Sequence, residues 1–119
     1  SLSEIYLKTF RDILSHNFKD TKVDFKHSEL IGIKNLINAY DQSVKNFYNL
    51  EVPKDLIEIH QKEISLLIGQ QRIFTAMANY QQDPLRAVLA SQAYDQLETE
   101  FSNLKDKIRD FVNKNKLNI

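Results

Sequence analysis

Two ionisable side chains, His60 and Glu63, lie three residues apart and could contribute to a metal site. Helical bundles that hold two metal ions use Glu-x-x-His twice, together with further inward-facing glutamates. This chain has His-x-x-Glu here, has no Glu-x-x-His, and has no cysteine that could supply a thiolate ligand. The ligand count therefore predicts no metal and no other cofactor, and it favours a histidine that is hydrogen-bonded within a core.

Gln71 and Tyr94 are the polar side chains expected to face inward together with His60. Positions spaced by three and four residues share one face of a helix. In the third expected helix, this face holds Ile57, His60, Ile64, Leu67, Gln71, Phe74 and Ala78. Tyr94 lies on the corresponding stripe of the fourth. A small-ligand pocket formed by His60, Gln71 and Tyr94 is one hypothesis, and internal hydrogen bonding in a packed core is the alternative.

Asp95 and Glu98 are one helical turn apart, which is a spacing that can serve acid–base catalysis inside a concave, dry pocket. They flank the apolar stripe, so we expect them at its solvated edge. The sequence has no nucleophile motif and no glycine-rich phosphate loop. We therefore expect no catalytic residue and a protein that is not an enzyme.

Composition narrows the fold and the partners. Lys and Arg number 16, Asp and Glu also number 16, and the formal net charge is zero. A nucleic-acid binder would carry a basic surface, so we expect no nucleic-acid partner. The 119 residues contain only two Gly and two Pro, which favours long helices, and they predict one all-α domain spanning 1–119.

The expected helix ends follow from capping residues. Ser28 can cap the second helix, Pro53 can open the third, and Asp83 can cap a fourth helix whose first residue is Pro84. The expected helices span about 3–18, 28–50, 53–81 and 84–115. Short connections between long helices place consecutive helices antiparallel. We therefore predict an antiparallel up-down-up-down four-helix bundle.

A sequence echo runs through the second and fourth helices. AYDQSVKNFYNL at 39–50 shares AYDQ, F and NL with AYDQLETEFSNL at 93–104. A duplicated helical hairpin would explain the echo, and so would convergence of two amphipathic helices. In both cases Tyr40 and Tyr94 occupy core positions. The shared stripe comprises Ile33, Leu36, Tyr40, Ser43, Phe47 and Leu50 in one helix and Ala87, Ala90, Tyr94, Leu97, Phe101 and Leu104 in the other.

The sequence resembles a group of uncharacterised small helical proteins from uncultivated, small-genome bacteria. The resemblance rests on LSEIY near the start, L-x-VP-x-x-L-x-x-x-H from Leu50 to His60, DPLRAVLA from Asp83 to Ala90, and Tyr94. Members of the group carry a membrane-spanning segment before this region. The resemblance thus implies an extracytoplasmic domain in the cell envelope, anchored through a segment that precedes Ser1. It implies no activity and no catalytic residue.

Two functions remain open. The first is a non-enzymatic, extracytoplasmic helical bundle for protein interaction or envelope structure, present as a monomer or weak oligomer. Aromatic residues outside the core stripes, which are enriched in interfaces, favour it; they are Tyr6, Phe18, Phe25, Tyr48 and Tyr80. The alternative is a small-ligand sensor or carrier with a pocket between its helices. A cavity within the bundle would favour this second function.

Overall fold

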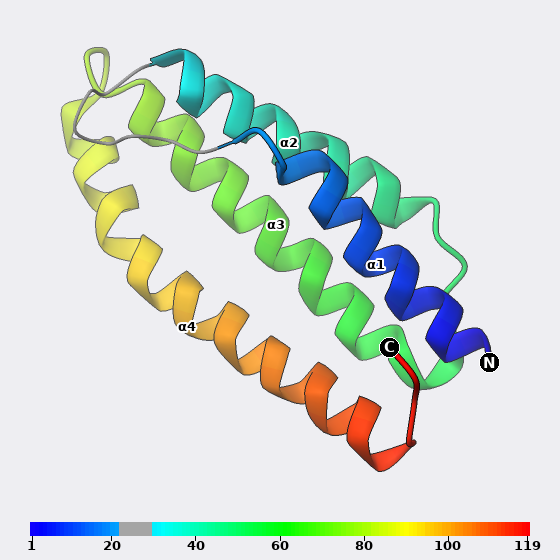
Figure 1. The fold of residues 1–119 in the computed structure, drawn as a ribbon. Coiled ribbons are helices and arrows are strands. Elements are labelled where there is room, and N and C mark those ends of the chain that lie inside the picture. The colour runs from blue at the N-terminus through cyan, green and yellow to red at the C-terminus, as the bar shows by residue number, and fades with distance from the viewer. Residues whose placement is uncertain (22–29) are drawn as a thin grey trace.

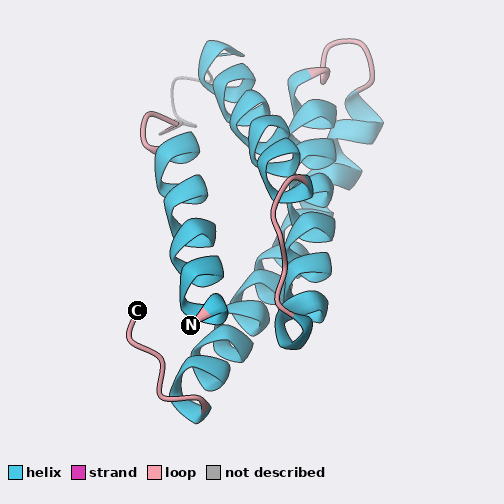
Figure 2. Cartoon of the chain, turned by 90° about the vertical axis from the view of Figure 1, so that its right-hand side faces the viewer, coloured by secondary structure: helices cyan, strands magenta, loops and turns pink. Residues whose placement is uncertain are grey.

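The fold is all-helical in the part of the chain that the structure, a computed structural model, describes: residues 1–21 and 30–119. Figures 1 and 2 show helices as the regular secondary structure of these residues, and successive helices alternate in direction along the long axis. The all-α prediction is confirmed. The helices are α1 (Leu2–Phe18), α2 (Leu30–Tyr48), α3 (Ile57–Ala78) and α4 (Pro84–Lys114), and a short 3-10 helix, η1 (Lys54–Leu56), precedes α3.

The predicted capping residues act as expected at one helix end, the start of α4. Asp83 Oδ1 accepts a hydrogen bond from the backbone N–H of Arg86 at 3.1 Å, and Pro84 is the first residue of α4, as predicted. Pro53 instead precedes η1, so α3 begins at Ile57 rather than at Pro53. The predicted cap Ser28 and the aromatic residue Phe25 lie outside the described residues.

The central helix is α3, because it packs along both α2 and α4. The remaining helix, α1, packs on α2 and makes no extensive contact with α4 among the described residues. The hairpin of α1 and α2 is therefore packed less extensively than the hairpin of α3 and α4. Duplication of a helical hairpin predicts that residues 3–50 superpose on residues 57–104, and this stays a prediction.

The core is deepest on the α2 side of the molecule. The predicted α2 stripe is buried at Leu36, Tyr40, Ser43 and Phe47. The α4 stripe faces inward as predicted, but it is shallower: Leu104 is buried, whereas Tyr94 and Phe101 are only partly buried. The difference arises because α4 has extensive helix contact only with α3 in the described residues.

Candidate ligand-binding site

The three residues predicted to form a pocket lie in different surroundings. His60 Nδ1 is 2.8 Å from the Tyr6 hydroxyl, so the predicted hydrogen-bonded histidine is confirmed. Gln71 Nε2 donates to Asp41 Oδ1 on α2 at 3.5 Å, and it lies about 16 Å from His60 along α3 by the rise of a helix. The Tyr94 ring packs edge-on against Phe74 at a centroid distance of 5.9 Å. The hollow that Gln71 lines includes neither His60 nor Tyr94, and the role of the three residues in binding stays a prediction.

A different cavity opens where α1 and α4 fail to meet. It has a volume of about 290 Å³, and α2 and α3 contribute its remaining walls. We call it the Glu63 groove, after the one acidic side chain that lines it. Its lining residues are Phe10, Leu14, Phe18, Tyr40, Glu63, Leu67, Gln70, Phe101, Leu104, Lys105 and Ile108.

Glu63 is the unusual member of this lining. Its side chain is buried, with 3% of the residue exposed, and its Oε1 atom has no hydrogen-bond partner among the described residues. Burial raises the pKa of the Glu63 carboxyl to about 7, and the positive charge of Lys105 opposes this rise. The groove therefore contains a carboxyl group that changes its charge near neutral pH.

The other polar residues of the groove leave Glu63 unpaired. Gln70, also buried, donates through Nε2 to Glu98 Oε1 at 2.8 Å, so its amide is already engaged. Burial is the main cause of a raised pKa at Tyr40, and the charges of Glu98 and Glu63 add to it. Lys105 is exposed and forms the groove's cationic edge. The resulting surface is apolar, with one acceptor lacking a donor.

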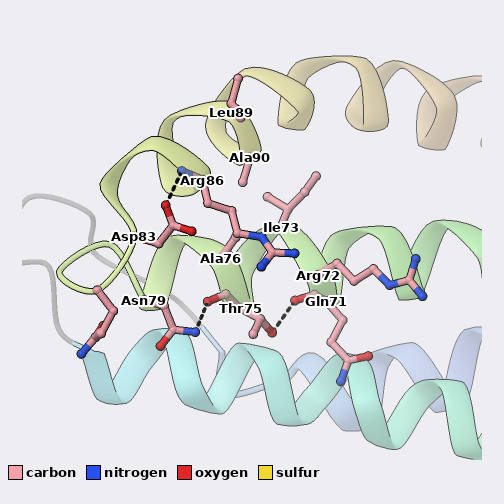
Figure 3. Close-up of a pocket in the computed structure, with 11 residues that line it drawn as sticks. Gln71, Arg72, Ile73, Thr75, Ala76, Asn79, Asp83, Arg86, Leu89 and Ala90 are labelled. Carbon is pink, nitrogen blue, oxygen red and sulfur yellow. Dashed lines mark hydrogen bonds between the residues drawn. The ribbon is translucent and has the colours of Figure 1, made fainter.

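A second hollow of about 750 Å³ lies between the end of α3 and the start of α4 (Figure 3). Its polar side chains are mostly engaged within their own helices: Thr75 Oγ1 donates to the Gln71 carbonyl at 2.8 Å, and Asn79 Nδ2 donates to the Thr75 carbonyl at 3.0 Å. Arg72 and Arg86 at its edge are exposed. Although this hollow is larger, no buried polar atom without a partner faces it within the described residues.

The expected acid pair lies at the surface. Asp95 and Glu98 are both exposed, which confirms their prediction as solvated edge residues.

Within residues 1–21 and 30–119, no group of three or more His, Asp or Glu side chains is placed to hold a metal ion. Over the same part of the chain, no helix is both long and apolar enough to cross a membrane. Comparison with protein families, curated proteins and solved structures finds no match.

Sequence reasoning missed Glu63 as a groove residue because it assigned a single inward face to α3. A second series at the same helical spacing comprises Glu63, Leu66, Gln70, Ile73 and Met77, and all but the partly buried Met77 are buried. A helix that packs against two neighbours buries a wider arc than one stripe. The signal that could have identified Glu63 is therefore its alignment with Leu66 and Ile73.

Proposed function

We propose that this chain is a non-enzymatic small-ligand-binding domain, acting as a carrier or sensor, whose ligand occupies the Glu63 groove. One observation carries the proposal: a glutamate that lines an apolar cavity is buried, and one of its carboxyl oxygens has no hydrogen-bond partner among the described residues. Leaving a buried polar atom unpaired costs about 1–3 kcal/mol, so folded proteins rarely do so without a compensating role. A ligand that supplies a donor to Glu63 would remove this cost.

The shape and lining of the groove support the same proposal. Ligand pockets are typically concave, mostly apolar, and carry a few polar groups that fix orientation. At about 290 Å³ the groove lies just below the usual range of about 300–1,000 Å³. The expected ligand is accordingly small. This site differs from the predicted set of His60, Gln71 and Tyr94, although it belongs to the same functional class.

Filling the groove should weaken ligand binding. Leu14→Trp places an indole in the lining, whereas Ser15→Trp adds the same group at an exposed neighbouring position of α1 and serves as the control. Three compounds with one apolar body, namely phenylbutylamine, phenylbutanol and phenylbutyrate, serve as probes. We expect at least one probe to bind wild type and Ser15→Trp with equal affinity. The same probe should bind Leu14→Trp with an affinity lower by at least about tenfold, as measured by calorimetry on folded protein. Equal binding to all three proteins, or binding to none, would contradict the proposal.

Protein interaction remains a second candidate function, because one apolar cluster is strongly exposed. Tyr80 lies in the turn before α4, and Leu85, Val88 and Leu89 lie in the first turns of α4. These four residues are 55%, 69%, 53% and 56% exposed. Large exposed apolar patches mark interaction surfaces. The simplest occupant is a second copy of the chain, which agrees with the expected weak oligomer.

This pairing predicts a specific mutational effect. Wild type should show concentration-dependent dimerisation in analytical ultracentrifugation, and Leu85→Glu should remove it by placing a charge in the apolar contact. Ser102→Glu, which adds the same charge at an exposed position farther along α4, is the control and should leave dimerisation intact. A wild-type chain that stays monomeric at all concentrations would exclude this occupant.

An extracytoplasmic location, with an anchor preceding Ser1, also remains a proposal. It rests on the resemblance noted from the sequence motifs. Protection of the domain from protease added to intact cells would argue against it.

A further inference from the structure

We propose that the ligand of the Glu63 groove is a small amine, whose ammonium group binds the Glu63 carboxylate while an aryl or alkyl body fills the apolar remainder. This inference rests on the proposed function and specifies its ligand class. It is carried by the presence of a buried glutamate, with one unpaired carboxyl oxygen, among the aromatic and aliphatic side chains that line the cavity.

The first step concerns the donor that Glu63 lacks. An ionised carboxylate accepts hydrogen bonds and cannot donate them, so its complement is an N–H or O–H group. Bonds between ammonium and carboxylate are shorter and about twice as strong as neutral ones. Burial of Glu63, at 3% exposed, limits the water that would otherwise screen the pair. An ammonium group therefore satisfies both the hydrogen-bonding need and the charge of this carboxylate.

The second step concerns the aromatic side chains around the cavity. Phe10, Phe18, Tyr40 and Phe101 all line the groove, and they come from α1, α2 and α4. Aromatic faces attract cations within about 6 Å of the ring, and the attraction grows when the cation is desolvated. The same rings provide apolar area for a hydrocarbon body. A small apolar amine thus matches the lining at both of its ends.

The third step concerns the charges around Glu63. Tyr6 on α1 and Tyr40 on α2 are buried phenols, and His60 on α3 is engaged with Tyr6. On α4, Glu98 accepts a hydrogen bond from Gln70, and the positive charge of Lys105 lowers the pKa of Glu63. Within the described part of the chain, neither Lys105 nor any other side chain donates a hydrogen bond to Glu63 Oε1. A ligand cation would therefore displace no such partner when it pairs with Glu63, although Lys105 weakens the attraction.

The competing ligand classes make opposite predictions. A carboxylate ligand would use Lys105 at the edge, and a neutral alcohol would use Glu63 in either protonation state. An amine requires the ionised carboxylate, so its affinity should increase as pH rises through the pKa of Glu63, and its binding should release a proton. The ligand ammonium stays charged over this range because alkylamines have a pKa near 10, like lysine. Anion binding should show the opposite trend, because a charged Glu63 repels it.

The experiment measures the affinity of phenylbutylamine, phenylbutanol and phenylbutyrate for wild type and three variants. Glu63→Gln removes the charge, Lys105→Gln removes the competing cation, and Glu58→Gln changes an exposed glutamate on the same helix as a control. We expect wild type to prefer the amine and Glu63→Gln to lose about tenfold or more of its amine affinity. Lys105→Gln should strengthen amine binding, and Glu58→Gln should leave it unchanged.

The outcomes separate this inference from the proposed function. Tighter binding of phenylbutanol or phenylbutyrate, lost in Leu14→Trp, would retain the groove as the ligand site and overturn the amine assignment. Amine binding that is insensitive to Glu63→Gln would overturn it too. If no compound binds wild type, the proposed function fails together with this inference. Helical circular dichroism of each variant checks that lost affinity does not reflect unfolding.

Discussion

Phe47→Ala is expected to lower the free energy of unfolding by about 3–5 kcal/mol, which is the range for truncating a buried aromatic side chain. Phe47 is fully buried, and its ring packs edge-on against Phe10 at 4.9 Å and lies 6.0 Å from the His60 ring. Its removal would leave a cavity that neighbouring helices can close only in part. Urea denaturation followed by circular dichroism measures the loss.

Phe101 is the matched control for this prediction, because it occupies the same place in the sequence echo. Its side chain is only partly buried and lines the Glu63 groove. Phe101→Ala should therefore cost less than Phe47→Ala, about 1–2 kcal/mol, while weakening ligand binding. Equal stability losses would show that α4 packs as tightly as α2, and would contradict the unequal packing of the two hairpins.

Much of the fold could be predicted from the sequence, because the deciding signals are local. Asp83 and Pro84 start α4 through their own hydrogen bonding and backbone geometry. The stripe from Leu36 to Phe47 follows from helical spacing alone. Depth of burial is different, because it depends on how many neighbours a helix has. Identical echo positions, such as Tyr40 and Tyr94, therefore differ in exposure.

For the candidate site, the sequence suggests a kind of site but does not identify the residues that form it. A pocket between helices is the second of the two hypotheses that the sequence leaves open, and the residues of the groove depend on the gap between α1 and α4, which no local pattern encodes. His60 faces inward as expected, yet it is engaged by Tyr6. Glu63 lies one turn after His60 on the same helix, and its residue type alone predicts an exposed, solvated charge. Its burial follows from the two-sided packing of α3, and this makes it the chemically distinctive residue.

The second large effect is expected in the pH dependence of stability. The pKa of Glu63 is raised from its ordinary value of 4.5 to about 7 in the folded protein. Between these values the folded chain holds a proton that the unfolded chain has released, so stability falls as pH rises. The stability contributed by the protonated carboxyl is fully present below about 4.5 and is lost as pH rises through about 7. The full difference is about 3 kcal/mol.

Glu63→Gln should remove this contribution, because its side chain stays neutral at every pH. We expect the variant to exceed wild type in stability by up to about 3 kcal/mol at about pH 8, and the two to converge near about pH 4. Urea denaturation across this range gives the comparison, and Glu58→Gln should follow wild type because Glu58 is exposed. A variant with the same pH dependence as wild type would show that Glu63 is not desolvated. A gain confined to high pH, together with lost amine affinity, would mean that the chain retains a destabilising carboxylate because its ligand needs it.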